Sequence, residues 1–543
     1  MSGAESFGCR IYAEYLERGR APGLPRTILR DFDPPPHTRC GESKVSPSPM
    51  SNRPFAQLQA AAIDGRTRTV FYRQTQLEKL HKSLVSNASE IVDAIVADAG
   101  LGRTEAQIEY SLALTAVRER FAELEPKKEL ENEYAIARGE NAGSLRLGYG
   151  TVYIKASADH TPFYSAIAPL SAAIAAGNCV VLQIENSLRS LPAILRNTLK
   201  SALDNDTFDI AQQPVQDASF LSGCLQVVQD GSVDGAAAQN QLVSKAGSIT
   251  AAIVDRTANL DETAKALVNA RFSFNGKSPY APDVIFINEF TKKDFLQALL
   301  RHSVSFDEVV EREKSPTRRT GRENGIRDLI SSLQKDGSGR VIAQESNRAI
   351  LEVTKRSTSL LKNKISEPVL LVHSVKSLDD AIDFINNNGN ELLAAYHFGE
   401  NAQCKYLSQF VSSQVSYVNH IPAELLVGPA FPVGHPVTST RYPTALFTRP
   451  TPAFVTNTTQ SKTVESALNG ASKSEKSTAV QTLYRQAVSD LPAAHKRPKQ
   501  LKAAFGFFEQ SMLFNLGFVL LSTGATIAAT VILGKRARAY YSH

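Results

Sequence analysis

The sequence is poor in the residues that build metal sites and disulfide frameworks. It has five cysteines at irregular spacing, with no CxxC pair and no cluster of cysteine with histidine: Cys9, Cys40, Cys179, Cys224 and Cys404. An odd number at such spacing is typical of reduced thiols facing the cytosol. The sequence therefore predicts neither a zinc site nor any other metal site, and no disulfide framework.

Two further absences exclude other classes of protein. No patch of Arg and Lys interleaved with aromatic residues is present, and much of the net charge of +6 lies in the two tails, so we expect no nucleic-acid binding. Residues 1–52 lack an apolar stretch long enough for a secretory signal, and their Pro, Arg, Ser and Gly content predicts a disordered segment. Their acidic residues argue against a mitochondrial transit peptide. Either Met1 or Met50 could be the true start.

The hydrophobic pattern from Arg73 onward is that of an α/β protein. Apolar residues at steps of three and four predict one helix or two consecutive helices up to Gly100, and then a second helical region at about 103–124. Residues 164–178 predict a buried helix of small residues, which the buried strand CVVLQIE follows at once. Helix, glycine and buried strand in this order are typical of a doubly wound α/β domain. The same order recurs at 251–290 and 367–388, whereas residues 309–340 are expected to be irregular.

The C-terminal region contains the longest apolar run. Residues 512–534 hold no charged residue over 23 positions, and Lys535, Arg536 and Arg538 follow them. At about 1.5 Å per residue, a helix of this length spans a hydrocarbon core of ~30 Å. A buried core helix is the alternative, but the segment follows a polar linker and ends nine residues before the last residue. We therefore predict a transmembrane helix at 512–534.

A single span at this place would anchor the protein by its C-terminal end and leave its bulk facing the cytosol. Asn515 and several Ser and Thr residues make the span only moderately hydrophobic, and basic residues stand on both sides of it. The bias of positive charge therefore does not select one membrane. The mitochondrial outer membrane, the peroxisome and the endoplasmic reticulum all remain open, with a slight preference for the first two.

Four motifs resemble the aldehyde dehydrogenase superfamily over about residues 53–455. They are EAQIEYSLAL, PFYSAIAPLSAAIAAGNCVVL, NGKSPYAPD and EPVLLVHSVKSLDDAIDFINNN. The resemblance implies an α/β two-domain fold, in which a doubly wound dinucleotide-binding-type domain is joined to a catalytic-type domain. The expected parts are a disordered segment, a degenerate dinucleotide-binding-type domain, a catalytic-type domain, a bridging segment used for dimerisation, a polar linker and the membrane helix, at 1–52, 53–244, 245–430, 431–455, 456–511 and 512–534. A fatty-aldehyde branch of this family also carries a C-terminal membrane anchor.

The family's chemistry needs a cysteine thiolate, which attacks the aldehyde carbon. The family pattern Gly-Gln-(Thr/Ser)-Cys-x-Ala-Pro-Asp is similar to residues 276–283 here, and Pro279 stands at the position of the cysteine. Proline offers no nucleophile and no backbone N–H, so one substitution removes the attacking atom and one donor to the oxyanion. Ser278 is adjacent, but no evident base is present to activate its hydroxyl.

Two further catalytic positions differ from the family. Lys245 stands where the general-base glutamate is expected, 34 residues before Pro279; a solvated or paired lysine is the preferred interpretation, and a Schiff-base lysine is the alternative. His160 replaces the asparagine of the oxyanion site. Because a histidine can still donate a hydrogen bond, we expect this second loss to be partial.

The positions that bind NAD(P) in the family also differ. Gln183 and Glu185 stand in the segment whose lysine meets the adenosine ribose, and Lys364 replaces the glutamate that orients the nicotinamide ribose. Only about fifteen residues separate residues 227–231 from Lys245, where the family has a strand, a turn and a helix that faces the pyrophosphate. That unit is expected to be deleted. We therefore expect no cofactor, with NAD or NADP as the cofactor if the protein is active.

The losses fall on functional positions while the core pattern is intact, which favours a pseudoenzyme that keeps its fold for binding or assembly. It would sit on a membrane through 512–534 and form a homodimer, or a heterodimer with a related dehydrogenase. Two alternatives remain open. One is an NAD(P)-dependent dehydrogenase that oxidises fatty or secondary-metabolite aldehydes with rearranged residues. The other is a tail-anchored scaffold.

Overall fold

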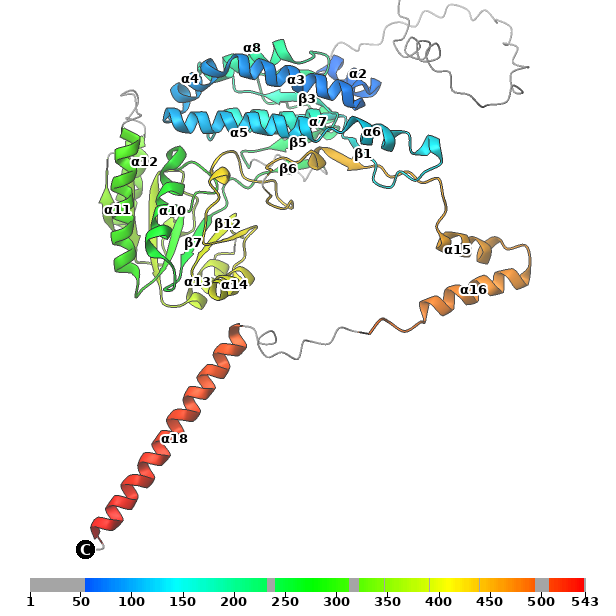
Figure 1. Ribbon diagram of the computed structural model, residues 1–543. Coiled ribbons are helices and arrows are strands. Elements are labelled where there is room, and N and C mark those ends of the chain that lie inside the picture. The colour runs from blue at the N-terminus through cyan, green and yellow to red at the C-terminus, as the bar shows by residue number, and fades with distance from the viewer. Residues whose placement is uncertain are drawn as a thin grey trace, which may run out of the picture. The chain divides into compact units, whose positions relative to one another are not determined.

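The structure is a computed structural model, and it describes residues 54–231, 240–311, 322–345, 347–389, 391–438, 440–493 and 507–541 (Figure 1). The chain divides into two units, Met1–Asn52 and Arg53–His543. The first unit, including the segment expected to be disordered, lies outside the described residues. Within the second unit, two separate parallel-type sheets organise the fold.

The first sheet has five parallel strands in the order β4-β3-β2-β5-β6. The strands are β2 (Thr151–Lys155), β3 (Cys179–Gln183), β4 (Phe208–Ala211), β5 (Leu225–Val228) and β6 (Gln241–Val243). Strand order reverses between β2 and β5, which are neighbours although the chain runs from β2 to β3. In open α/β sheets, such a reversal marks the edge where ligands bind.

Helices cover both faces of this sheet (Figure 1). The larger layer consists of α3 (Val70–Ser86), α4 (Ala88–Ala99), α5 (Arg103–Ala122), α7 (Pro162–Ala175) and α8 (Ser190–Ala202). The opposite face packs against α2 (Ala56–Asp64) and the short α9 (Ala218–Ser222). β3 is buried on both faces, as its unbroken apolar sequence predicted.

The second sheet has seven strands in the order β13-β12-β7-β8-β11-β10-β9. They are β7 (Thr250–Val254), β8 (Val284–Asn288), β9 (Gly339–Gln344), β10 (Ala349–Val353), β11 (Val369–Val375), β12 (Ala394–Phe398) and β13 (Ser416–Val418). Only β9, at one edge, runs antiparallel to its neighbour. One face packs on α10 (Leu260–Phe272) and α11 (Lys292–Glu311), and the other on α12 (Arg322–Lys335), α13 (Leu378–Asn387) and α14 (Asn401–Phe410).

The remaining elements lie outside these two sheets. β1 (Arg146–Gly148) and β14 (Thr448–Pro450) form a two-stranded antiparallel sheet. Thus the segment 431–455 supplies one strand of this sheet and the N-terminal region supplies the other. Helix α6 (Pro126–Glu133) precedes β1, and short 3-10 turns join several elements: η2 (Arg66–Arg68), η3 (Ile136–Arg138), η4 (Ser273–Gly276), η5 (Ser359–Leu361), η6 (Ala423–Leu426) and η7 (Thr444–Phe447).

Three expectations from the sequence need correction. The described part of the stretch 309–340 is largely helical and not irregular, because α11 extends to Glu311 and α12 fills Arg322–Lys335. The linker holds two helices, α15 (Thr459–Asn469) and α16 (Lys473–Ala487). Finally, the interval before Lys245 keeps a strand, β6, so it is shortened and not wholly deleted; residues 232–239 lie outside the described residues.

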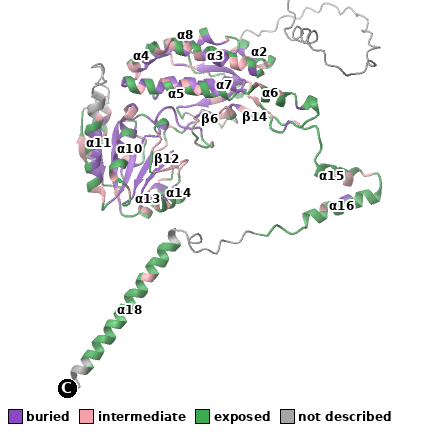
Figure 2. Ribbon diagram, viewed as in Figure 1, coloured by how far each residue is buried: buried purple, intermediate pink, exposed green. Residues whose placement is uncertain are grey.

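The last described element is α18 (Phe507–Tyr541), whose part Glu509–Arg536 is long and apolar enough to cross a membrane. None of that apolar window is buried against the rest of the described chain, as the exposed colour along the helix shows (Figure 2). A core helix of a soluble protein would instead be mostly buried. The helix therefore provides one candidate membrane span, and it contains the predicted residues 512–534.

Candidate functional site

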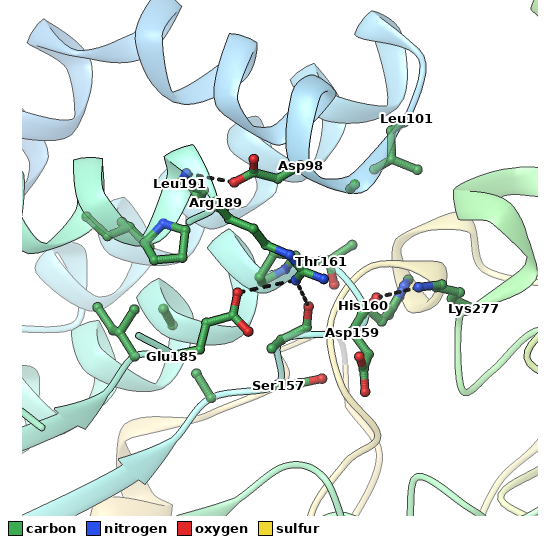
Figure 3. Close-up of a pocket in the computed structure, with 18 of the residues that line it drawn as sticks. Asp98, Leu101, Ser157, Asp159, His160, Thr161, Glu185, Arg189, Leu191 and Lys277 are labelled. Carbon is green, nitrogen blue, oxygen red and sulfur yellow. Dashed lines mark hydrogen bonds and ion pairs between the residues drawn. The ribbon is translucent and has the colours of Figure 1, made fainter. Parts of the chain in front are cut away.

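A pocket opens at the carboxyl ends of β2 and β3, where an open α/β sheet binds its ligands (Figure 3). Apolar lining residues come from α7 and α8 and include Ala166, Leu191 and Leu195. Its rim is polar and charged, with Asp98, Asp159, Glu185, Arg189 and Lys277 among the lining residues. His160 and Gln183, two positions singled out from the sequence, also line it. The pocket thus coincides with part of the predicted site.

Arg189 crosses this pocket (Figure 3). Its guanidinium forms an ion pair with Glu185 at 3.3 Å and donates a hydrogen bond to the carbonyl of Ala158 at 3.3 Å. Glu185 also accepts from the Ser187 hydroxyl at 2.8 Å. The carboxylate that could have met a ribose is therefore already bound by residues of its own loop.

Both long helices that leave this edge of the sheet have their N-termini capped by carboxylates of the protein itself. Asp98 accepts from the backbone N–H groups of Ser190 and Leu191 at 3.1 and 2.7 Å, at the start of α8. Glu109 accepts from those of Phe163 and Tyr164 at 2.9 and 3.2 Å, at the start of α7. A free helix N-terminus attracts phosphate. At α7 and α8 the N–H groups already donate to Glu109 and Asp98, so they are not free to bind a phosphate.

Glu109 is fully buried, and its second carboxyl oxygen has no hydrogen-bond partner among the described residues. Burial raises the pKa of this carboxyl to about 7, although the two backbone N–H groups oppose the shift. Near neutral pH the side chain is therefore divided between its neutral and charged forms. Glu109 lies in the motif EAQIEYSLAL, from which no role was predicted for it.

The crevice between β2 and β5, where strand order reverses, is closed by a side chain. Gln229 follows β5 and is 1% exposed. Its carbonyl oxygen accepts from the Ser157 N–H at 2.8 Å, and its amide nitrogen donates to the Ser165 carbonyl at 2.9 Å and to the Tyr442 hydroxyl at 3.1 Å. Beside it, Lys155 and Asp230 form an ion pair at 2.7 Å that links the ends of the two strands. Every polar group of the Gln229 side chain is therefore used inside the protein.

Pro279 lies buried in the turn between η4 and β8. Its carbonyl accepts hydrogen bonds from the Thr250 hydroxyl at 2.9 Å and from the Lys364 ammonium at 2.5 Å. The neighbouring Ser278 is fully buried, and its hydroxyl accepts from the Tyr280 N–H at 3.3 Å. No histidine or carboxylate contacts that hydroxyl among the described residues. Ser278 therefore has no base that could activate it.

Lys364 does not face a ribose but enters a buried charge cluster behind Pro279. It pairs with Asp283 at 2.9 Å, and Asp283 also pairs with the fully buried Arg271 at 3.2 Å. Asp283 accepts two further hydrogen bonds, from the N–H groups of Thr250 and Ile365 at 2.8 and 3.1 Å. Burial lowers the pKa of Lys364, while Asp283 opposes that shift. The lysine at the family's glutamate position is thus a structural member of the core.

His160 is buried, and its Nε2 lies 2.8 Å from the carbonyl oxygen of Leu426. A carbonyl only accepts, so Nε2 carries the proton and donates there. Burial lowers the pKa of His160 to about 3, so the ring is neutral and its Nδ1 has no proton to give. The expectation of a partial loss needs correction, because this histidine has no donor left for an oxyanion.

The remaining two predicted positions are not brought to a reactive arrangement. The Lys245 side chain is exposed, so the burial that would favour a neutral, nucleophilic amine is missing. Gln183 is partly buried, and its carbonyl oxygen accepts from the Tyr153 hydroxyl. Gln183 is the last residue of β3, whereas Lys245 follows β6, which is the edge strand three positions away in the same sheet.

The three cysteines that the structure describes do not replace the missing nucleophile. Cys179 and Cys224 pack in the small core cluster beneath α2 and α9, and Cys404 lies in α14. All three are buried, and burial raises the pKa of Cys179 and Cys224 to about 12 and that of Cys404 to about 11. A reactive thiol needs a lowered pKa. None of these three is therefore poised for attack.

These contacts decide whether a dinucleotide fits the described residues. It would need helix N–H groups for its phosphates and free side chains for its riboses. Here the N-termini of α7 and α8 are capped, Gln229 closes the crevice, and Glu185 and Lys364 are bound internally. The described residues do not fit the cofactor. The described part of the chain also holds no group of three His, Cys, Asp or Glu residues that could bind a metal.

Sequence reasoning missed Asp98, Glu109, Arg189, Gln229 and Asp283. Three of them, Asp98, Glu109 and Gln229, act through partners far along the chain: 92 residues separate Asp98 from Ser190, and 213 separate Gln229 from Tyr442. One signal was available, since Asp283 lies in the same motif as Pro279. The others carry no local pattern that distinguishes a cap or a plug from a solvated side chain.

Comparison with known proteins bears on both fold and site. The model of the aldehyde dehydrogenase family matches residues 55–427. The 4,4'-diaponeurosporen-aldehyde dehydrogenase of Staphylococcus aureus is 24% identical over 378 residues, covering 65% of this chain and 80% of that protein. Aldehyde dehydrogenase family 3 member B1 of Mus musculus is 26% identical over 376 residues, covering 64% and 78%.

Solved structures give the same fold. The substrate-bound state of Staphylococcus aureus AldH superposes with a TM-score of 0.64 at 20% identity, covering 79% of this chain and 98% of that one. The indole-3-acetaldehyde dehydrogenase complexed with NAD+ superposes with a TM-score of 0.59 at 15% identity, covering 74% and 87%. The fold is that of an aldehyde dehydrogenase.

Proposed function

Because the chain belongs to the aldehyde dehydrogenase family, we propose that it is a membrane-anchored member that no longer oxidises aldehydes and keeps the fold for binding or assembly. A fold does not determine function, so evidence for a loss of activity has to come from the residues of the site. The observation that carries the proposal is Pro279, which stands where the family pattern has its cysteine.

The surroundings of Pro279 support this reading. Its carbonyl is held by Thr250 and Lys364 at 2.9 and 2.5 Å. A cysteine placed here would bring back a thiol and a backbone N–H, but His160 still donates to the carbonyl of Leu426 and Lys245 remains exposed. The nucleophile, the oxyanion donors and the general base would all have to be rebuilt for the family's reaction.

Other residues support the loss of cofactor binding. Members of this family use NAD or NADP, yet in this chain Glu185 is paired with Arg189, Lys364 is paired with Asp283, and Gln229 closes the β2–β5 crevice. The two lesions lie in separate parts of the fold. Repairing one is therefore not expected to repair the other.

The names of the relatives favour a second candidate function. Both relatives described above are named as aldehyde dehydrogenases, at 24% and 26% identity. The alternative is an NAD(P)-dependent dehydrogenase that oxidises fatty or secondary-metabolite aldehydes with rearranged residues. It requires an activated nucleophile, which the described residues around Pro279 do not supply.

Dinucleotide titration separates these two candidates. Full-length protein in detergent or nanodiscs is titrated calorimetrically with millimolar NAD and NADP, and NADH formation is followed with a long-chain aldehyde. We expect neither binding nor turnover. Micromolar binding together with NADH formation would refute the proposal, and a cofactor-binding relative serves as the positive control.

A repair variant tests which lesion is deeper. Pro279→Cys with Lys245→Glu should still produce no NADH, because the β2–β5 crevice remains closed. Adding Gln229→Gly opens that crevice, and a gain of NAD binding in this triple variant alone would identify Gln229 as the block. If the double variant is already active, the proposed loss of cofactor binding is wrong.

The anchor and the partners complete the proposal. One C-terminal apolar helix, Glu509–Arg536, supplies the means of attachment. We propose that it holds the folded body on the cytosolic face of the mitochondrial outer membrane, the peroxisome or the endoplasmic reticulum, and that the protein forms homodimers or heterodimers with a related dehydrogenase. Fluorescent fusions with and without residues 507–543 test the location, and co-purification from cells that express both proteins tests the heterodimer.

A further inference from the structure

Helices α15 and α16 lie between the two-sheet body and the membrane span, in a segment whose composition predicted only a linker. Each begins with a well-formed cap: the Thr458 hydroxyl accepts from the Ser461 N–H at 3.1 Å, and the Ser472 hydroxyl accepts from the Glu475 N–H at 3.1 Å. Glu475 in turn accepts from the Ala471 N–H at 3.0 Å. Such caps specify helix starts locally.

The two helices pack against each other as an antiparallel hairpin, joined by residues 470–472 (Figure 1). Their least exposed apolar positions are Ala467 on α15 and Ala479 and Leu483 on α16, and only Ala479 is buried. Helices of 11 and 15 residues are marginal in isolation. A hairpin with one buried residue has too little core to be stable alone.

Most of both helices is in the exposed colour (Figure 2), and the exposed residues include five of the larger apolar ones. The exposed fractions are 39% for Val464, 68% for Leu468, 54% for Val480, 67% for Tyr484 and 57% for Val488. They recur at steps of four, as an apolar stripe on a helix does. We call these five residues the hairpin face.

Geometry places all five on one side of the hairpin. Val464 and Leu468 each follow a half-buried residue of α15 by one position, and Val480 and Tyr484 follow Ala479 and Leu483 in the same way. One position turns a helix by about 100°. The two helices run antiparallel and face each other, so a turn of about 100° from the inward-facing residue points to the same side of the hairpin in both helices. The apolar residues of α15 and those of α16 therefore lie on one side. An antiparallel pair with one apolar side is half of a four-helix bundle.

We propose that the hairpin face pairs with the hairpin face of a second copy of this chain, so that α15 and α16 of two anchored molecules form a four-helix bundle above the membrane. A two-fold interface joins a patch to itself, which one apolar side satisfies. This inference does not depend on whether the protein binds a dinucleotide.

The area involved indicates how strong the pairing is. Burying one apolar side chain removes roughly 100 Å² from water, so five per copy give on the order of 1,000 Å² for the pair. Stable interfaces start at about 1,200 Å². The pairing is therefore weak in solution and depends on the anchor, because only 20 residues separate Val488 from Glu509 and the membrane holds the hairpins at a common height.

A membrane surface is the rival occupant of the hairpin face, but the charges argue against it. Helices that lie on membranes carry Lys and Arg on the polar face and Trp, Phe or Leu on the other. Here the two helices carry both signs of charge: Lys462, Glu465, Lys473, Glu475, Lys476 and Arg485. Only Tyr484 in the hairpin face is aromatic. These features fit a protein partner better.

The test compares two double variants of the full chain in liposomes, using energy transfer between differently labelled copies. Leu468→Asp with Tyr484→Asp places two aspartates in the hairpin face. Lys462→Asp with Thr482→Asp places two on the opposite side, one position before the inward-facing residues. We expect the first pair to weaken association by roughly tenfold or more and the second to leave it within about twofold. Equal association of both variants, or a monomeric parent chain, would overturn the proposal.

A second measurement identifies what covers the hairpin face. The chain has no tryptophan, so Tyr484→Trp is a single reporter. We expect its emission to shift to shorter wavelength as the protein-to-lipid ratio rises, without quenching by brominated lipids. Quenching at low protein density would mean that the face lies on the membrane. Hydrogen exchange over residues 459–487 checks that the helices of each aspartate variant still form. If the variant Leu468→Asp with Tyr484→Asp keeps its helices and still associates as the parent chain does, the proposal is contradicted.

Discussion

Asp283 pairs with two buried cations, Arg271 and Lys364, beside Pro279, the residue at the position of the family's catalytic cysteine. One carboxylate there pairs with both Arg271 and Lys364 and accepts hydrogen bonds from two backbone N–H groups. Removing one partner of a buried ion cluster costs more than the cluster contributes, because the other charges stay buried and unpaired. The cluster therefore makes the present residues depend on one another.

Asp283→Ala should lower the free energy of unfolding by about 3–5 kcal/mol, measured by urea denaturation of the full chain in detergent. Asp261→Ala is the matched control, since that exposed carboxylate also pairs with two side chains, Arg301 and His302. The control should lose less than about 1 kcal/mol. Similar losses in the two variants would show that the buried cluster does not stabilise the fold.

Glu109 makes the stability depend on pH. Its folded pKa, about 7, lies above the ordinary value of 4.5, so the folded state holds the proton more tightly than the unfolded state. The stabilisation is complete below about 4.5 and is lost as the pH rises through 7. In the parent protein, the free energy of unfolding should therefore fall by up to about 3 kcal/mol between pH 5 and 8, and Glu109→Gln should remove this fall. Denaturation midpoints at both values check this; an unchanged slope would contradict it.

Single residues also show where the sequence was informative. Pro279 could be predicted because it lies inside a recognisable motif, and so could the changes at Lys245 and His160. What these side chains do instead could not be predicted, because Lys364 reaches Pro279 across 85 residues and His160 reaches Leu426 across 266. Such partners depend on the tertiary fold, and no local pattern encodes them.

At the scale of elements, the buried strands and amphipathic helices followed the hydrophobic pattern. The buried strands β3, β7, β8 and β11 lie where unbroken apolar runs predicted them. The helices that were not predicted have polar sequences. The segment of α15 and α16 was predicted to be a linker because of its polar composition, although Thr458 and Ser472 are residues that commonly cap helices. The helix α12 was missed for the same reason, since its charged sequence hides Ile326, Ile330 and Leu333.

The turn at η4, which leads into Pro279, requires glycine. Gly276 has φ of +71°, and a Cβ there would lie 2.6 Å from the backbone nitrogen of Pro368. Gly276→Ala combines left-handed strain with a backbone clash and should destabilise by about 2–5 kcal/mol, measured by thermal or urea denaturation. Gly247→Ala, where a Cβ meets nothing within 4 Å, should stay within about 1 kcal/mol. Equal losses would show that the turn can relax.

At the scale of the whole molecule, α18 holds the candidate membrane span, which we propose attaches the protein to a membrane. Each Arg placed at the centre of a spanning helix costs about 3–4 kcal/mol relative to Leu or Ile. Leu521→Arg with Ile527→Arg should therefore release the protein into the soluble fraction after an alkaline wash, whereas Leu521→Ala with Ile527→Ala should leave most of it with the membrane. Retention of the arginine variant would mean that another part of the chain holds it there.

The capped N-termini of α7 and α8 have a consequence for how the protein persists in a cell. An enzyme that binds a nucleotide gains stability in proportion to the logarithm of its supply, so starvation weakens it. Here the carboxyl groups of Asp98 and Glu109, which are part of the protein itself, occupy those two helix ends. The abundance of this protein should therefore stay level when redox metabolism empties or fills the nicotinamide pool.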